Sequence, residues 1–309
     1  NFALNGMTPI DFENQLKILS KKFNFLSSND IVAAIKDQKP IKKNSAIVTF
    51  DDGLREQYDY ALPILKKNKI AAIFYVNTQP LSENKVSEVH KIHLLRSTLN
   101  DVQFKKEIIN KISLQKFNEY IDDTTQINNQ YKYDNKDTAI LKYILNFKLS
   151  FNERRELLDY LFKKHIKTSE KEISQKLYMN PYMLKKLADC NYLGTHCHEH
   201  LPMESLNDVG IYKQILNSLD YFKSIDIFNI NSISYPYGGY SAVSKRVANI
   251  AKDLGIIFGF TMERALNSNL NNPLLFARFS NDDLPGGKHS NWRLEQVPNE
   301  LPKAKWFNC

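Results

Sequence analysis

Apolar residues occur along this chain in short runs separated by longer segments of helical periodicity. Runs typical of strands lie at residues 45–50, 70–76, 191–196, 230–238, 255–262 and 273–279. They are apolar at nearly every position, which favours strands of a buried parallel sheet over half-exposed antiparallel strands. Because helical segments alternate with most of the runs, the sequence predicts an α/β protein.

Capping signals delimit several of the predicted helices. Thr8 and Pro9 predict an N-cap and a first helical residue for a helix that extends to about Lys22, and a second helix begins near Asn29. Gly255 predicts the end of another helix. Helical spacing is found at residues 54–68, 206–225 and 241–255.

The alternation is interrupted between about residues 80 and 175. This segment is polar, rich in Asn and Lys, and mostly helical in pattern. Capping boxes are predicted at Ser150 with Glu153 and at Ser169 with Glu172. We interpret the segment as a helical insertion in a single domain that covers residues 1–309.

The composition is that of an ordinary globular protein, with 42% hydrophobic and 25% charged residues. No apolar segment approaches the roughly 20 residues of a membrane helix. The net charge of +8 comes from scattered lysine pairs and not from a basic run with interleaved aromatic residues. Nucleic-acid binding is therefore not expected.

The cysteines and the first residues bear on the compartment. Cys190, Cys197 and Cys309 are too few for a disulfide framework and favour free thiols. The opening residues, NFALNGMTPIDF, lack the basic head and long apolar core of a signal peptide. We expect a cytoplasmic protein, with an exported chain from which a signal was removed as the alternative.

Two adjacent carboxylates follow the first apolar run, in the sequence TFDDG at residues 49–53. In an α/β barrel, residues at the carboxyl ends of strands meet at one face, where active sites lie. Asp51 and Asp52 are at such an end, and Gly53 permits the sharp turn that would direct both into one pocket.

A histidine cluster in GTHCHEH, residues 194–200, is the predicted partner of these carboxylates. If the chain turns into a helix after Gly194, His196 and His200 lie at i and i+4 and can bind one metal ion, while His198 points elsewhere. Two histidines and one carboxylate suit a catalytic Zn²⁺ site, or another first-row divalent ion. One aspartate would then bind the metal, and its neighbour would act as base for the bound water.

Other histidine-rich sites fit less well. A zinc protease helix needs His-Glu-x-x-His, but Glu199 is followed directly by His200. The chain lacks the Pro-Cys-x-x-Cys pair of nucleotide deaminases and the short alternating strands of iron oxygenases that use the same ligand types. We interpret Cys197 as a small packing residue.

A third motif, SYPYGGYS at residues 234–241, also follows a predicted strand. Pro236 fixes the backbone and Gly238 with Gly239 permits a turn, so the loop could direct a backbone N–H at a developing oxyanion. Taken alone, the motif also fits an ordinary tyrosine-lined turn.

The order of TFDDG, Gly-Thr-His-x-x-x-His and YPYG resembles the polysaccharide deacetylase family, which is carbohydrate esterase family 4 or the NodB-homology domain. The resemblance covers roughly residues 45–80 and 178–280. It implies a distorted, incomplete (β/α) barrel, to which residues 80–175 add a helical insertion. It also implies metal-dependent removal of an acetyl group from an N-acetylated sugar.

The resemblance assigns roles motif by motif. It implies that Asp51 is the catalytic base and that the backbone N–H of Tyr237 stabilises the oxyanion. It implies that the metal ligands are Asp52, His196 and His200.

Two positions depart from the family pattern. Many members have an arginine, paired with the catalytic base, two residues before the proline of the third motif, where this chain has Ser234. Arg278 could supply that charge, and an unrelated salt bridge is the alternative. The family's Leu-x-x-His general-acid motif is also absent. His289 is the nearest replacement in chain order, with His90 and His93 as rivals.

These observations predict a hydrolase of carbon–nitrogen bonds, an N-deacetylase that acts on a glycan, a glycan precursor or a nucleotide sugar. Hydrolysis of another amide or imide on the same fold, and a non-catalytic carbohydrate-binding protein, are the alternatives. The sequence does not indicate the sugar, the natural metal or the oligomeric state.

Overall fold

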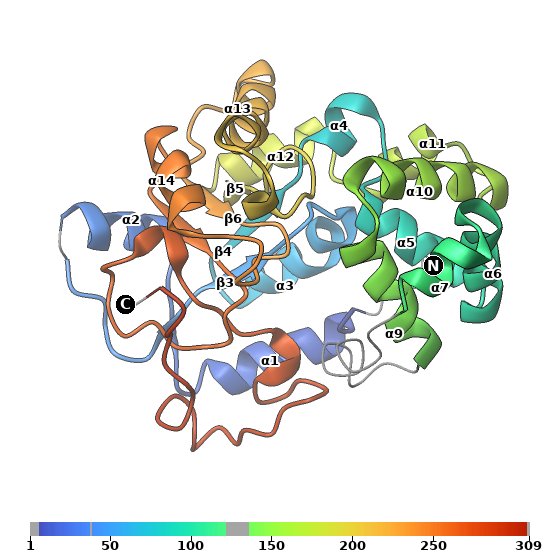
Figure 1. Ribbon diagram of the computed structural model, residues 1–309. Coiled ribbons are helices and arrows are strands. Elements are labelled where there is room, and N and C mark those ends of the chain that lie inside the picture. Colours follow the sequence, from blue (N-terminus) through green and yellow to red (C-terminus); the bar gives the residue numbers. More distant parts are fainter. Residues whose placement is uncertain (1–5, 38, 122–135, 308–309) are drawn as a thin grey trace. The chain divides into compact units, whose positions relative to one another are not determined.

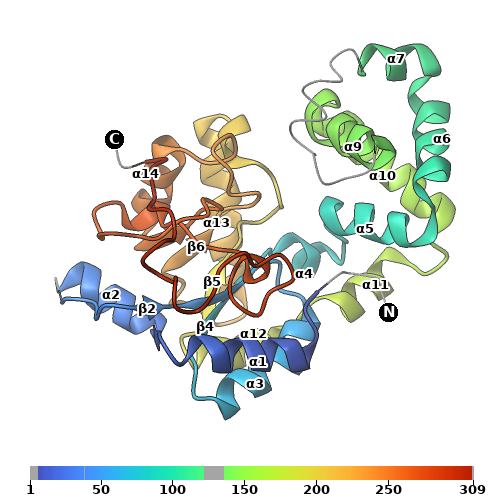
Figure 2. The same cartoon turned by 90° about the horizontal axis from the view of Figure 1, so that it is seen from below.

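The computed structural model describes residues 6–37, 39–121 and 136–307. The chain divides into two compact units. We call them the sheet unit, which comprises Met7–Lys85 and Lys171–Cys309, and the helical unit, which contains Val86–Glu170. Figures 1 and 2 show the elements of each unit.

The sheet unit is built on five parallel strands that are hydrogen-bonded in chain order. The strands are β3 (Val48–Phe50), β4 (Ala72–Val76), β5 (Leu193–Thr195), β6 (Ser232–Ser234) and β7 (Phe258–Phe260). A parallel sheet wound in one direction places its crossover helices on one face and curls toward a barrel, and five strands are too few to close the usual eight-stranded one. The observed sheet confirms the predicted incomplete (β/α) barrel (Figure 1).

Side chains of β4 alternate between the two faces of this sheet. Phe74 packs with Leu65 and Leu184 of the covering helices. Tyr75 points to the concave face, where its ring centroid lies 6.2 Å from that of Phe260. Both faces are therefore buried, which explains why the strand is apolar at every position.

The run at residues 45–50 is divided between two sheets. Strand β2 (Ser45–Ala46) pairs in parallel with β1 (Asn24–Phe25), and β3 begins only at Val48. Strand β1 was not predicted, because two residues carry no measurable periodicity.

The sixth predicted strand, residues 273–279, is wrong. The segment instead begins with the 3₁₀ turn η4 (Pro273–Leu275), and a single isolated bridge joins Phe276 to Phe260. Pro273 cannot donate a ladder hydrogen bond, and the turn occupies the residues that further pairing would need. The bridge nevertheless carries the following residues past the carboxyl end of β7.

Helices of the sheet unit begin where the capping signals predict. The side chain of Thr8 accepts the N–H of Asp11 at the start of α1, although that helix ends before Lys22. Gly255 follows α14 with φ of 89°, as expected for a helix stop. The helices are α1 (Pro9–Leu19), α2 (Ser28–Lys36), the π-helical η1 (Gln57–Ala61), α3 (Leu62–Lys67), α4 (Gln79–Glu83), α11 (Glu170–Leu177), α12 (Pro181–Ala188), α13 (Asp208–Ser224) and α14 (Lys245–Asp253), with 3₁₀ turns η3 (Met203–Ser205) and η5 (Asn281–Asp283).

The helical unit has its own apolar core, in which Phe104, Ile108 and Leu158 are fully buried. Ser150 and Glu153 form the predicted capping box. Its described elements are α5 (Glu88–Thr98), α6 (Asp101–Ile112), α7 (Leu114–Glu119), α9 (Lys136–Tyr143), the π-helical η2 (Ile144–Lys148) and α10 (Phe151–His165). That this unit is an insertion in a single domain stays a prediction.

No helix within the described ranges is both long enough and apolar enough to cross a membrane.

Gly194 of β5 provides a test of the packing on the concave face. A Cβ atom there would lie 2.3 Å from Cε1 of Tyr75 and 2.9 Å from Oγ of Ser232. We expect Gly194→Ala to lower the free energy of unfolding by about 3 kcal/mol, because the fully buried Tyr75 ring has no room to move. Urea unfolding measures the change, and Gly239→Ala, whose Cβ would meet nothing within 4 Å, is the control. Equal stability of the two variants would contradict this packing.

Candidate metal centre and active site

The predicted site residues follow different strands but meet at one edge of the sheet. Asp51 follows β3, His196 follows β5, and the loop with Tyr237 follows β6. Because the strands are parallel, their carboxyl ends lie at the same edge. The topology therefore brings together residues that are far apart in the chain.

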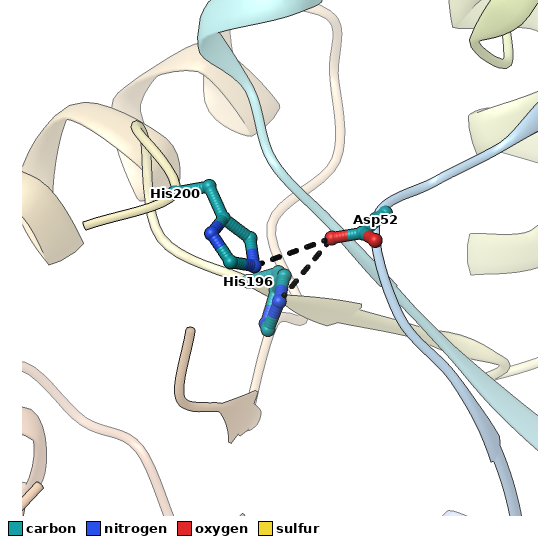
Figure 3. Close-up of side chains that lie close together, drawn as sticks. All are labelled: Asp52, His196 and His200. Atoms are coloured by element: carbon teal, nitrogen blue, oxygen red, sulfur yellow. Dashed lines mark ion pairs between the residues drawn. The ribbon is translucent and has the colours of Figure 1, made fainter. Parts of the chain in front are cut away.

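Asp52, His196 and His200 form a compact cluster (Figure 3). Oδ1 of Asp52 lies 3.5 Å from Nε2 of His196 and 3.6 Å from Nε2 of His200. One possible ligand atom of each residue lies within 4.8 Å of those of the other two. The imidazole rings of the two histidines are at 67° to each other, with centroids 5.2 Å apart.

This cluster fits a first-row divalent cation. Donor atoms about 2.1 Å from Zn²⁺ in a tetrahedral arrangement are about 3.4 Å apart, close to the two observed separations. Two imidazole nitrogens and a carboxylate oxygen are donors that Zn²⁺ and its first-row neighbours accept. Three protein ligands leave a coordination position open for water or substrate.

The two histidines do not reach the site from a helix. Residues after Thr195 form a turn, in which Cys197 adopts a left-handed φ of 63°. The predicted i, i+4 arrangement is therefore wrong, although the predicted convergence of His196 and His200 is observed. His198 points elsewhere, as predicted: its Nδ1 lies 2.9 Å from Oγ1 of Thr78.

A hydrogen bond fixes the orientation of His196. Its Nδ1 lies 2.6 Å from the carbonyl oxygen of Ser234. A carbonyl only accepts, so Nδ1 carries the proton and Nε2 is left with its lone pair toward Asp52. The imidazole is 2% exposed, and the surrounding residues hold it in this position.

Asp51 is held by Arg278 in a two-pronged ion pair. Nη1 donates to Oδ1 at 3.0 Å, and Nη2 donates to Oδ2 at 2.5 Å. The guanidinium also donates to Oγ of Ser234 and to the carbonyl oxygen of Thr261. Arg278 therefore provides the positive charge beside Asp51 that many family members obtain from an arginine at the position of Ser234.

The pKa of Asp51 reflects two opposing effects. Burial raises it, whereas the positive charge of Arg278 and the hydrogen bonds from Arg278 lower it. The net effect lowers the pKa of Asp51 below its usual value of 3.8, so this carboxylate is ionised at neutral pH.

Backbone geometry separates the two adjacent carboxylates. Asp52 and Gly53 both have left-handed φ values, 75° and 66°. A Cβ at Gly53 would lie 2.8 Å from Cγ1 of Val76, so only glycine fits there. This turn lets Asp51 point to Arg278 while Asp52 points to the histidines.

The loop after β6 closes one side of the site. Tyr237 has a φ of 60°, and its ring lies 4.6 Å from that of His200, edge to face. Gly238 has a φ of 53°, and its N–H donates to the carbonyl oxygen of Pro236 at 2.7 Å. The loop is thus next to the metal cluster, and the role of the Tyr237 N–H stays a prediction.

The candidate general acids lie in other surroundings. His289 is exposed, and its backbone N–H donates to the carbonyl oxygen of Asp282. His90 and His93 belong to the helical unit, where Nδ1 of the buried His90 lies 2.9 Å from Oγ of Ser87. None of the three is part of the metal cluster.

The two cysteines in the described part of the chain, Cys190 and Cys197, are free thiols. Cys197 is fully buried in an apolar cluster, and burial raises its pKa. Cys190 is exposed and not in a disulfide. Cys309 lies outside the described residues.

Ser234 belongs to the site through two contacts that the sequence did not predict. Its carbonyl accepts from His196 and its hydroxyl accepts from Arg278, so one residue contacts both halves of the site. From the sequence, Ser234 indicated only that the arginine expected at this position is absent. Its contact with His196 uses the backbone carbonyl, which every residue has, so the residue type could not predict it.

Comparisons with known proteins bear on the family and the fold of this chain. The family model described as polysaccharide deacetylase matches residues 38–128 and 152–258, more than half of the chain. A comparison with curated proteins gave no match.

Solved structures with a similar fold include three deacetylases or related proteins. Deacetylase PplD of Streptococcus pyogenes, in complex with acetate, is 16% identical, with 88% of this chain and 80% of that chain covered and a TM-score of 0.52. IcaB from Ammonifex degensii is 14% identical over 92% and 89%, with a TM-score of 0.55. The BpsB deacetylase domain from Bordetella bronchiseptica is 15% identical over 90% and 86%, with a TM-score of 0.53. At such identities the likeness shows the fold.

Metal binding provides a direct test of the cluster. We expect Asp52→Ala and His200→Ala to weaken Zn²⁺ binding by more than about 100-fold. Removal of a residue that only supports a metal ligand costs up to about 100-fold in affinity, and loss of a ligand itself should cost more. Calorimetric titration of metal-free protein with Zn²⁺ measures the affinity. His198→Ala is the matched control, since its imidazole faces Thr78. A loss as large in this control would contradict the assignment.

Proposed function

Since this chain belongs to the polysaccharide deacetylase family, we propose that it is a metal-dependent hydrolase that removes the N-acetyl group from an amino sugar of a glycan or glycan precursor. The reaction consumes water and gives acetate and a free amino sugar. One observation carries the proposal: the Asp52–His196–His200 cluster lies at the same sheet edge as a second, separately paired carboxylate, Asp51.

A divalent cation held by Asp52, His196 and His200 would supply Lewis acidity, lowering the pKa of water toward about 7 and polarising the amide carbonyl. The three residues fit this role by donor type and spacing. His196 is suited to it further, because Ser234 fixes its tautomer.

Asp51 accepts the proton of the attacking water. Arg278 keeps this carboxylate ionised and fixes the direction of its two oxygens. The same pairing makes Asp51 a weaker base, a cost that the lowered pKa of the water offsets.

The backbone N–H of Tyr237 would donate to the oxyanion that forms as water adds to the carbonyl. A preorganised donor aimed at developing charge typically contributes about 10²–10³ in rate. The left-handed φ of Tyr237 and its contact with His200 place this loop next to the metal cluster, which supports the role.

Departure of the amine requires a proton, since an amine anion is an untenable leaving group. His289 stays the predicted source, although its exposed side chain would have to reach the substrate. Asp51, once it has taken the proton of the water, is the alternative proton donor to the departing amine.

Acetate in the PplD structure is consistent with this proposal, since acetate is the acid product of the reaction proposed for this chain.

A screen of N-acetylated sugars, nucleotide sugars and oligosaccharides for released acetate tests the proposal. We expect release to depend on Zn²⁺ or another divalent ion and to stop on chelation. Small cyclic amides in the same screen test the alternative hydrolase. Cleavage of these amides without any acetate release would overturn the proposal.

Asp51→Asn tests the proposed base. We expect it to lower kcat for acetate release by about 10²–10⁴-fold while Zn²⁺ affinity is retained, because the amide cannot accept the proton. Elemental analysis alongside the assay separates loss of base from loss of metal. A wild-type rate in this variant would exclude Asp51 as the base.

Arg278→Ala tests the proposed positioning of Asp51. We expect kcat to fall by about 10–100-fold with KM nearly unchanged, since Arg278 acts through the base. Arg278→Lys should recover only part of the rate, because an ammonium cannot pair with both carboxylate oxygens. A rise in KM with unchanged kcat would instead indicate a role in substrate binding.

A further inference from the structure

We propose that Tyr240, Phe307 and Trp306 bind a second sugar of the substrate, next to the sugar that is deacetylated. This inference rests on the proposed function and makes the substrate an oligomer. We call the three residues the aromatic platform. The rings of Tyr240 and Phe307 are stacked, with centroids 5.8 Å apart and planes at 16°, and Trp306 stands edge-on to Tyr240 at 6.1 Å.

The platform presents a large aromatic surface to solvent. Tyr240 is 66% exposed, whereas Phe307 is buried beneath it and Trp306 is half-buried. Stacking fixes the plane of the Tyr240 ring, so little side-chain freedom is left to lose when a ligand binds. An exposed and already ordered aromatic ring is a suitable surface for a flat ligand.

A buried carboxylate ties the platform to the active-site edge. Glu263 is 5% exposed, and its Oε1 accepts the N–H of Lys305 at 2.5 Å and that of Trp306 at 3.1 Å. The carbonyl oxygen of Glu263 accepts the N–H of Arg278 at 2.9 Å. The segment with Phe307 is thus held by the residue that also holds the partner of Asp51.

The platform is also close to the metal cluster along the loop after β6. Tyr240 is three residues beyond Tyr237, whose ring contacts His200. Three residues span at most about 11 Å, so the Cα atoms of the two tyrosines are no further apart than a short oligosaccharide can bridge. A sugar at the metal cluster and its neighbour on Tyr240 can therefore belong to one chain.

Chemistry favours a sugar on this surface. One face of a pyranose ring carries mainly C–H groups, which are slightly positive, and an aromatic ring has a negative face. The pair excludes water from both surfaces without requiring a charged group. The phenolic hydroxyl of Tyr240 can in addition bond to sugar hydroxyls.

Tyr240→Ala, compared with Tyr240→Phe, tests the platform with N-acetylglucosamine and its linear oligomers of two to five sugars. We expect the alanine variant to raise KM for the pentamer by about three- to tenfold, with kcat unchanged and with the single sugar unaffected. The phenylalanine variant should stay close to wild type, because it keeps the ring. Phe228→Ala is the control: Phe228 is 71% exposed, but it precedes β6 and so belongs to the opposite edge of the sheet.

A binding measurement separates this inference from the proposed function. The chain has two tryptophans, so Trp292→Phe leaves Trp306 as the only indole reporter. We expect its fluorescence to change on titration with the pentamer but not with the single sugar, and the change to be lost in Tyr240→Ala.

Length-dependent binding without acetate release would support the platform and contradict the proposed function. Acetate release with equal kcat/KM for all oligomer lengths, unaffected by Tyr240→Ala, would support the proposed function and contradict the platform. Absence of length-dependent binding in the titration would overturn the platform.

Discussion

Two adjacent carboxylates at a half-buried sheet edge repel each other, and this repulsion is relieved when each side chain has its own partner. In this protein the left-handed turn at Asp52 and Gly53 sends the two side chains to different partners. Asp51 pairs with Arg278, and Asp52 faces two imidazoles with the spacing of metal ligands. Without the guanidinium, mutual repulsion and burial would both favour protonation of Asp51, which would then be unable to act as the proposed base.

Sequence patterns predicted those parts of the structure that depend on local or periodic signals. Five of six apolar runs contain strands, and Asp51 and His196 directly follow two of them, so the position of the site followed from the fold class. The pairing of Arg278 with Asp51 was predicted from a missing charge elsewhere in the motif, and the structure shows it. A requirement for charge balance can thus identify a partner that spacing alone does not.

Other features could not be predicted, because they depend on contacts without sequence periodicity. His196 and His200 converge through a turn at Cys197. Their sequence spacing is also that of an i, i+4 pair on a helix, so spacing alone could not distinguish the two conformations. The segment at residues 273–279 has the apolar pattern of a strand, but it forms a 3₁₀ turn and a single bridge to Phe260. The carbonyl of Ser234 orients His196. Because every residue has a backbone carbonyl, the sequence could not indicate this contact.

The pairing of Asp51 with Arg278 also has a consequence for folding order. The two residues are separated by 227 positions, whereas the metal cluster is complete in sequence at His200. During synthesis from the N-terminus, the residues of the metal cluster leave the ribosome well before Arg278 does. Closing such a long loop is among the slow steps of folding. The nascent chain would therefore contain all three residues of the metal cluster before it contains the arginine that pairs with Asp51.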